Sequence, residues 1–455
     1  MPVNLQKEKR AVAALAFLYA LRMFGLFMVL PVLSLYAADY SGSTPFLMGM
    51  ALGVYGISQS LLQMPMGLLS DKIGRRPVVI AGLVLFAVGS VVAALSTSIY
   101  GLLLGRFLQG CGAVSSALMA LVSDLSSEQN RTRAMATVGA SIGISFSAAM
   151  IAGPMLSAYG GLSTLFWITF VLALLGILLM AFVVPVQTGA ERIQAHHDTL
   201  PAPNLLLRVL KDPDLLRLNA GIFVLHCALM ACFTVMPALL EQQLGLPRAK
   251  HWEVYLPVLV GSFIAMLPLM IVAERKRQMK RVFLIAVGML AIAFGWLALD
   301  YTSNIGLLTG LFLFFFAFNL LEAQLPSLVS KLSFAGGRGT AMGVYSTCQF
   351  LGISTGGILG GLLHQYSHPA ALFGLLALLA LIWWGLAFGM REPRYLTNIM
   401  LKVAATPDNA ETMRSQLAEI QGVEEVLVAP EEETAYLKIN DVTLDRPALE
   451  VFRMV

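Results

Sequence analysis

Several ionisable residues lie inside long apolar stretches of this sequence, where a charged side chain is costly. Glu322, in FNLLEAQLPSLVSK, is the one carboxylate well inside such a stretch, and His226 is a second titratable group in another. A carboxyl or imidazole group in such a place can bind a proton and release it again. The alternatives are structural: Glu322 forms a fixed ion pair with Arg22, its natural counter-charge, and His226 is merely hydrogen-bonded in place.

Arg106 is a further charge within an apolar stretch, GRFLQGCGAVSSA, with Gln109 one turn later. Burying an arginine at the centre of a bilayer costs roughly 3 kcal/mol on insertion scales, so its guanidinium requires a cavity or a partner. A second interpretation is that Arg106 snorkels to the outer membrane surface, since it lies near that end of its apolar stretch.

The composition predicts that these residues lie in membrane helices. Hydrophobic residues make up 58% of the 455 residues and charged residues 12%, whereas soluble domains carry about 25% charged residues. The chain has room for twelve spans of about 20 residues each. We predict them near 11–37, 45–70, 78–96, 101–123, 134–158, 163–184, 217–240, 253–273, 282–300, 304–328, 341–363 and 370–390.

Basic residues gather in alternate loops. Lysines and arginines are frequent in the N-terminal segment, in every second short loop and in the central linker, while the opposite loops carry them only at Arg248 and Lys250. Positive charge in short loops stays on the cytoplasmic side. We therefore expect the N-terminus, the linker and the C-terminal tail to be cytoplasmic. Asp39 and Glu241 lie near the outer surface and need no special role.

The short segment Gly67–Pro77, GLLSDKIGRRP, joins the second span to the third. Glycine lets a neighbouring helix approach closely and permits backbone angles that other residues resist. An ordinary positive loop explains the basic residues but not the acidic one or the two glycines. The pattern G-x-x-x-D-[RK]-x-G-[RK]-[RK] is matched in full by Gly67, Asp71, Lys72, Gly74, Arg75 and Arg76.

This pattern resembles the signature loop of the major facilitator superfamily. The resemblance implies a transporter whose two six-helix halves alternate between inward-open and outward-open states. It also implies a conformational latch. Asp71 faces the start of the eleventh span near 339–342, where a helix N-terminus carries about half a positive charge. Asp124 pairs with Arg75, and Arg76 belongs to the same latch. Breaking it favours the inward-open state.

Two further spans resemble motifs of the same family. Arg-x-x-Gln-Gly-x-Gly at Arg106 resembles a fourth-span motif associated with proton coupling. The fifth span resembles a motif found chiefly in antiporters, with Gly143, Gly153 and Pro154 at its key positions. The resemblance implies that these glycines pack against the eighth span in the other half, although ordinary helix packing would require the same glycines.

An internal repeat divides the chain. A shift of 207 residues places Arg131 on Arg338 and Gly153 on Gly360, as parallel six-span halves require. The predicted organisation is an N-terminal half at 1–184, a linker at 185–216, a C-terminal half at 217–393 and a tail domain at 398–455. The linker is interpreted as solvated, with a short surface helix at 205–210. Its adjacent His196 and His197 form at most a weak metal site.

The tail alternates strand and helix patterns in the order β-α-β-β-α, which resembles the ferredoxin-like fold. The loop AATPDN lacks a cysteine pair, so copper-type metal binding is not expected. A facilitator with such a tail resembles the bacterial YajR transporter group. Acidic residues outnumber basic ones in this tail. We hypothesise that it docks on the basic cytoplasmic loops and modulates opening. The alternative is a solvated appendage.

The fold class we predict is an all-α membrane protein of twelve helices with a small α+β tail. The expected function is proton-coupled efflux of small lipophilic compounds in a bacterial inner membrane. The alternatives are a metabolite symporter or facilitator, and a membrane sensor that acts through its tail. No nucleotide loop, catalytic triad or metal-ligand cluster is found, so no enzyme activity, cofactor or metal is expected. The expected partners are a small-molecule substrate, protons and lipid, without nucleic acid, and the protein is expected to be a monomer.

Overall fold

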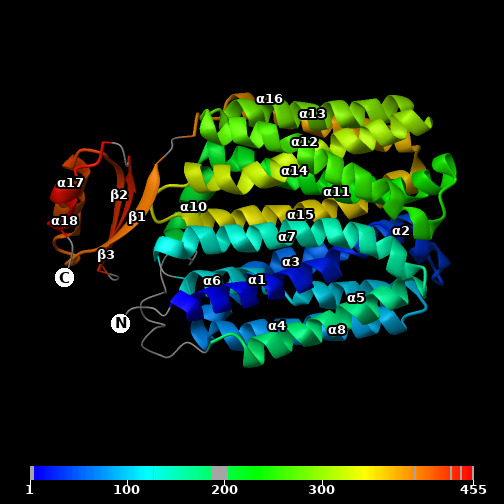
Figure 1. Ribbon diagram of the computed structural model, residues 1–455, viewed down its shortest axis with the longest axis horizontal. Coiled ribbons are helices and arrows are strands. Elements are labelled where there is room, and N and C mark those ends of the chain that lie inside the picture. The colour runs from blue at the N-terminus through cyan, green and yellow to red at the C-terminus, as the bar shows by residue number, and fades with distance from the viewer. Residues whose placement is uncertain are drawn as a thin grey trace.

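The computed structural model describes residues 5–126, 128–185, 203–393, 396–430, 433–440 and 443–452. His196 and His197 lie outside these ranges. Long helices lie side by side in a bundle, and a small domain lies beyond one end of it (Figure 1). We call this end, which also carries Gly67–Pro77, the loop end. The opposite end, which carries residues 37–44 and 245–251, is the distal end.

The N-terminal half contains the six predicted spans, two of them broken. The first is divided into a long helix and a single turn, and the fourth is interrupted at residues 112–114. Its elements are α1 (Leu5–Phe27), α2 (Leu33–Tyr36), η1 (Ala37–Asp39), α3 (Pro45–Ile73), α4 (Arg75–Leu95), α5 (Ile99–Cys111), α6 (Ser115–Asp124), α7 (Glu128–Ser157) and α8 (Gly161–Phe182).

The C-terminal half contains six unbroken long helices, preceded by the predicted short helix of the linker. Each covers its predicted span and extends it by a few residues, except α16, which ends slightly earlier. The elements are α10 (Pro203–Lys211), α11 (Pro213–Leu244), η2 (Arg248–Lys250), α12 (Trp252–Arg275), α13 (Met279–Asp300), α14 (Asn304–Leu332), α15 (Arg338–Tyr366) and α16 (Pro369–Phe388).

Helix α15 joins the two halves. Of the described segments, eleven are long and apolar enough to cross a membrane on their own composition, and α15 is not among them. It packs along α3 of the other half through glycines. A Cβ at Gly53 would lie 2.6 Å from the Ser354 carbonyl oxygen, and one at Gly49 would clash with the Gly357 carbonyl. Its small and polar residues therefore reflect contact with protein rather than lipid.

The halves touch at the distal end and stand apart at the loop end. The close glycine contacts of α3 begin at Gly49 and end at Gly56, near the middle of the helix. Toward the loop end, by contrast, no atom of a neighbouring described segment lies within 4 Å of the Cβ position of Gly139, Gly143 or Gly343. This conformation is open between the halves toward the loop end.

The internal repeat appears as equivalent packing. Gly153 of α7 packs against the Met28 carbonyl that follows α1, and Gly360 of α15 packs against Ala231 and Thr234 of α11. Each is a fifth helix packed on the first helix of its own half. Helix α7 does contact α12. For Gly143 and Gly153, however, the predicted packing on the eighth span is not observed, since Gly153 faces α1 and Gly143 faces open space.

The tail has the predicted order of elements: β1 (Thr397–Lys402), α17 (Ala410–Glu419), β2 (Val423–Ala429), β3 (Thr434–Ile439) and α18 (Arg446–Glu450). The strands form an antiparallel sheet in the order β1-β3-β2. Both helices lie on the side of the sheet that faces away from the bundle (Figure 1). Between them and the sheet is a small apolar core, to which Leu401, Leu417 and Leu437 contribute.

The tail docks on the turn between α14 and α15. The Lys438 amine, buried although charged, donates to the Lys331 carbonyl oxygen at 3.1 Å, in the last turn of α14. The Ala335 amide donates to the Glu425 carboxylate at 3.1 Å. A cation at a helix C-terminus stabilises the unpaired carbonyls there. The tail thus contacts this turn through backbone groups of the turn, while docking through acidic and basic side chains and an effect on opening stay predictions.

Candidate functional site

Glu322 and His226 are brought together from different helices of the C-terminal half. The Glu322 Oε2 atom of α14 lies 3.8 Å from the His226 Nε2 atom of α11. The imidazole is buried, with 3% of its side chain exposed, whereas 37% of the Glu322 side chain is exposed. Oε2 itself is buried and accepts no hydrogen bond from the residues that the structure describes. The two candidate proton carriers therefore form one pair, of which the carboxyl group is the more accessible member.

Two hydrogen bonds hold the imidazole. Its Nδ1 atom lies 3.3 Å from the Ile222 carbonyl oxygen one turn earlier on α11. Its Nε2 atom lies 2.8 Å from the Gln349 amide nitrogen of α15. The Phe318 ring, one turn before Glu322 on α14, lies 5.8 Å from the imidazole between centroids. Three helices thus meet at His226.

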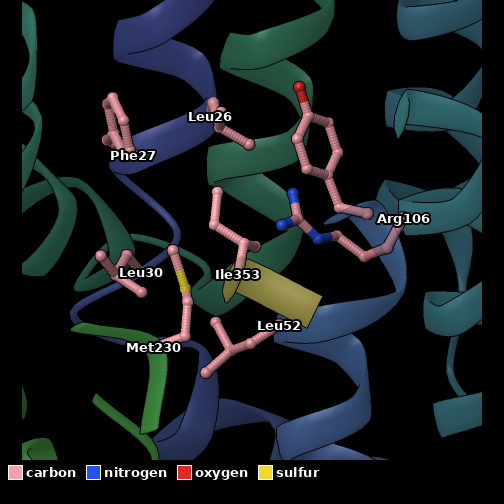
Figure 2. A pocket seen from close by; sticks show the side chains of 8 residues that line it. Leu26, Phe27, Leu30, Leu52, Arg106, Met230 and Ile353 are labelled. Atoms are coloured by element: carbon pink, nitrogen blue, oxygen red, sulfur yellow. The ribbon is translucent and has the colours of Figure 1, made fainter. Parts of the chain in front are cut away.

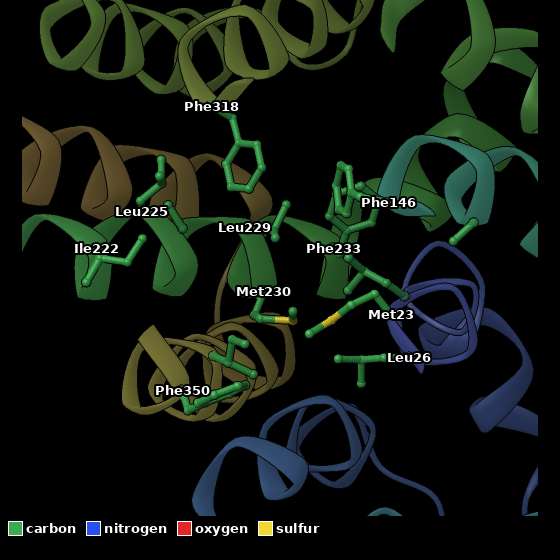
Figure 3. Close-up of a cluster of buried hydrophobic side chains, with 14 of the residues drawn as sticks. Met23, Leu26, Phe146, Ile222, Leu225, Leu229, Met230, Phe233, Phe318 and Phe350 are labelled. Atoms are coloured by element: carbon green, nitrogen blue, oxygen red, sulfur yellow. The ribbon is translucent and has the colours of Figure 1, made fainter. Parts of the chain in front are cut away.

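Apolar side chains from both halves form a buried cluster beside this pair (Figure 3). Phe146 of α7 stacks on Phe318 with ring centroids 5.8 Å apart, and it meets Phe27 edge-on at 4.9 Å. Met23 of α1 and Met230 of α11, both buried, point toward each other where the halves meet (Figure 3). Aromatic and thioether groups of this kind adapt to apolar molecules of varied shape.

Arg22 does not pair with Glu322, which corrects the expectation that it is the counter-charge. It is buried in the N-terminal half, where it donates to Ser115 Oγ at 2.5 Å and to the Tyr55 hydroxyl and Gln59 Oε1 at 3.2 Å each. It also donates to the Gly112 carbonyl at 3.2 Å. That carbonyl lies where α5 breaks before α6, so Arg22 satisfies a backbone group that the break releases.

Arg106 is buried, so the alternative of snorkelling to the outer surface is wrong. Its Nε donates to the Ala51 carbonyl at 3.2 Å, and an η-nitrogen donates to Gln109 Oε1 at 2.9 Å. Gln109 in turn donates to Ser90 Oγ at 2.8 Å. The guanidinium carbon lies 5.1 Å from the centre of the Tyr55 ring, a cation–π contact.

A small cavity adjoins Arg106 at the interface between the halves. It has a volume of about 20 Å³, which is room for about one water molecule. Figure 2 shows the guanidinium beside Ile353 and Leu52, with Leu26, Phe27 and Met230 across from it. A substrate does not fit here in this conformation.

The signature-loop residues meet around Arg75. It forms ion pairs with Asp71 and with Asp124, the latter at 3.3 Å between Nε and Oδ2. Arg76 donates to the Ala181 carbonyl of α8. Gly74 has φ of 105°, a region that favours glycine. A Cβ at Gly67 would lie 3.1 Å from Ser116 Oγ, so both glycines have the roles that their positions predicted.

A polar contact at the distal end was missed by the sequence analysis. Arg248 of η2 lies 3.4 Å from Asp39 of the other half and 3.4 Å from Glu241. Its guanidinium carbon also lies 5.2 Å from the centre of the Tyr36 ring. The available signal was Arg248 itself, because basic residues are otherwise scarce in the loops at this end. These groups join the halves where the halves touch.

Two six-helix halves with parallel repeats, a signature loop and ionisable groups in the space between them define a membrane transporter. The sequence pattern of the Major Facilitator Superfamily matches residues 15–357. The chain belongs to this superfamily.

Relatives and solved structures agree with this assignment. The inner membrane transport protein YajR of Escherichia coli K12 is 45% identical over 97% of both chains. The multidrug resistance protein MdtH of Aeromonas salmonicida is 27% identical, covering 76% of this chain and 85% of its own. The crystal structure of the human organic anion transporter MFSD10 (TETRAN) superposes with a TM-score of 0.60 at 20% identity, covering 84% of this chain and 99% of its own. At that identity the superposition reports the fold alone.

Proposed function

We propose that this protein is a proton-coupled antiporter that expels small lipophilic compounds by alternating access. The observation that carries the proposal is the pair of Glu322 and His226, 3.8 Å apart beside a cluster of apolar side chains from both halves. A carboxylate in apolar surroundings is costly, whereas a neutral carboxyl group is tolerated. Loss of the proton from Glu322 therefore requires a change in the surroundings, such as the arrival or departure of substrate.

The exchange follows from this requirement. In the conformation open toward the loop end, Glu322 is accessible and substrate enters beside it. Substrate then drives release of the carboxyl proton on this side, and the loaded protein turns to face the distal side. There substrate leaves and Glu322 takes up a proton again, which permits the return. Each ligand favours one state through its differential affinity, as population shift requires.

The lining of the space supports a lipophilic substrate. Phe146, Phe318, Met23 and Met230 are buried against one another in this conformation, and they bring few hydrogen-bonding groups to the place where the halves meet. A metabolite rich in hydroxyl or carboxylate groups needs more polar partners than this lining supplies. The name of the related MdtH, a multidrug resistance protein, supports the same class of substrate.

The expected orientation places the loop end in the cytoplasm, because the basic residues of short loops gather there. The relative from Escherichia coli is named an inner membrane protein, which supports a location in a bacterial inner membrane. In this orientation the conformation described is inward-open, the state in which an exporter collects its substrate.

The test uses purified protein in liposomes that enclose a pH-sensitive dye. A proton gradient is imposed, a panel of lipophilic cations, neutral compounds and metabolites is added, and proton flux is recorded for wild type and Glu322→Gln. The proposal expects flux triggered by a lipophilic compound in wild type and loss of that flux in the variant. The matched control is Glu274→Gln, because Glu274 pairs with Lys331 outside the space between the halves.

Two results would contradict the proposal. Triggered flux of wild-type size in Glu322→Gln would move the proton site away from the pair. Flux driven only by polar metabolites in wild type would favour the symporter or facilitator alternative.

A further inference from the structure

Gln349 has no role in the proposed exchange of substrate for a proton. Its amide nitrogen lies 2.8 Å from His226 Nε2, the same nitrogen that Glu322 Oε2 approaches to 3.8 Å. A hydrogen-bond donor, the Gln349 amide, and a carboxyl oxygen of Glu322 therefore approach the same ring nitrogen. Gln349 belongs to α15, the helix that packs along α3 of the other half.

The hydrogen bonds fix the form of the imidazole. A carbonyl oxygen only accepts, so Nδ1 donates its proton to Ile222. In a neutral imidazole the other nitrogen then carries the lone pair, which accepts the Gln349 N–H. The bond from Gln349 thus belongs to neutral His226. When Nε2 gains a proton it becomes a donor, and the Gln349 N–H opposes it.

We propose that Gln349 is a positioning residue that controls proton transfer between Glu322 and His226 through its hydrogen bond to the ring. While its N–H occupies Nε2, the ring nitrogen accepts a proton less readily. When the Gln349 side chain turns away, the N–H leaves and the lone pair is released. The proton then passes from the Glu322 carboxyl oxygen to Nε2. An O–H bond breaks and an N–H bond forms, leaving a carboxylate beside an imidazolium.

The surroundings agree with this role. Among the described residues, the titratable groups recorded around the pair are Glu322 on α14 and the Tyr345 hydroxyl, one turn before Gln349 on α15. The Tyr345 hydroxyl is buried and has no hydrogen-bond partner within the described ranges. In the part of the chain that the structure describes, the ion-pair partner of His226 is Glu322. The protonation state of the His226 imidazole therefore depends on Gln349 and Glu322.

This inference rests on the proposed antiport, but its first test needs no substrate. The protein is labelled with ¹⁵N-histidine, and the His226 signal, one of six histidines, is identified with His226→Gln. The signal is titrated with pH in wild type, in Gln349→Met, which removes the donor at similar size, and in Gln349→Glu, which offers chiefly an acceptor. Gln349→Met removes one hydrogen bond to the neutral imidazole, so the proton affinity of His226 Nε2 should rise about fivefold. In Gln349→Glu this affinity should rise further.

A second measurement reads the coupling. In liposomes, Gln349→Met should raise the proton leak that occurs without substrate. Gln349→Asn keeps an amide on a shorter side chain and should leak less than Gln349→Met. A purely structural role of Gln349 would change the melting temperature but leave the His226 titration and the leak unchanged. An unchanged His226 titration in both Gln349→Met and Gln349→Glu would overturn the inference. Failure of the antiport itself would appear separately, as wild-type protein without substrate-triggered flux.

Discussion

The two halves hold their buried charges in different ways. In the N-terminal half, the terminal nitrogens of Arg22 and Arg106 donate to carbonyl, hydroxyl and amide oxygens, although Arg22 Nε is buried without a partner among the described residues. In the C-terminal half, Glu322 Oε2 and the Tyr345 hydroxyl find no hydrogen-bond partner in the described part of the chain, and part of Glu322 is accessible. An arginine keeps its charge under all physiological conditions, whereas a carboxyl and an imidazole group do not.

This difference suggests a division of labour. The arginines close a broken helix and tie α3, α4 and α5 together, so they stabilise one rigid half. The pair in the other half can change its charge, which is what coupling to protons requires. The two sets of residues should therefore respond differently to substitution: the arginines through stability, and the pair through transport.

The largest expected effect is on the stability of the arginine network. Arg106→Leu leaves the Gln109 oxygen and the Ala51 carbonyl without their donor, at a cost of about 1–3 kcal/mol each. We expect little folded protein, or a melting temperature well below wild type in detergent. Glu322→Gln should melt like wild type. The comparison fails if Arg106→Leu is as stable as wild type or if Glu322→Gln is the less stable of the two.

A smaller effect is expected at the signature loop. Asp71→Asn removes the negative charge that pairs with Arg75 and, by resemblance, faces the start of α15 in the opposite conformation. Charge–dipole contacts of this kind contribute about 0.3–1 kcal/mol, so transport should fall roughly two- to fivefold while the protein stays folded. Export rates and melting temperature would be measured together. Unchanged export would refute the latch, and a strong loss of stability would place Asp71 with the structural arginines.

The smallest effect is expected at the tail. Lys438→Ala removes the cation that bonds to the Lys331 carbonyl and should loosen the tail from the turn between α14 and α15. Amide hydrogen exchange of residues 331–337 should become faster, because the bond contributes about 1.5–3 kcal/mol to docking. The rate of export should change by about twofold or less. Lys402→Ala, an exposed lysine of β1, is the control. Equal exchange in both variants would argue against the observed docking as a stable contact.

Much of the fold was predictable because apolar runs of the right length report directly on membrane spans. The tail was also predictable, since its strand and helix patterns are short and well separated. Helix breaks were missed. At the break at residues 112–114, the Gly112 carbonyl accepts a hydrogen bond from Arg22, 90 residues away in the sequence. Helix α15 is harder to identify as a span from its composition, because its small and polar residues contact α3 and not lipid.

The candidate site was predictable in its members but not in its pairings. Glu322 and His226 stand out individually as ionisable residues in apolar runs, yet nothing in the sequence places α11 beside α14 at that depth. Arg22 was predicted to be the counter-charge of Glu322 because opposite charges attract. The prediction is wrong, because Arg22 donates its hydrogen bonds to polar side chains and to the carbonyl of a broken helix within its own half. Gln349 and Arg248 were missed because their partners come from other helices and loops.

The most direct test of this account is the number of protons released when substrate binds to purified protein in weakly buffered detergent solution. Wild type, Glu322→Gln and Arg106→Lys would be compared, with a lipophilic compound that triggers flux in liposomes. The account predicts release in wild type, none in Glu322→Gln, and release in Arg106→Lys in proportion to the folded fraction. Release of wild-type size from Glu322→Gln, or its absence from fully folded Arg106→Lys, would contradict the assignment of proton coupling to the C-terminal half.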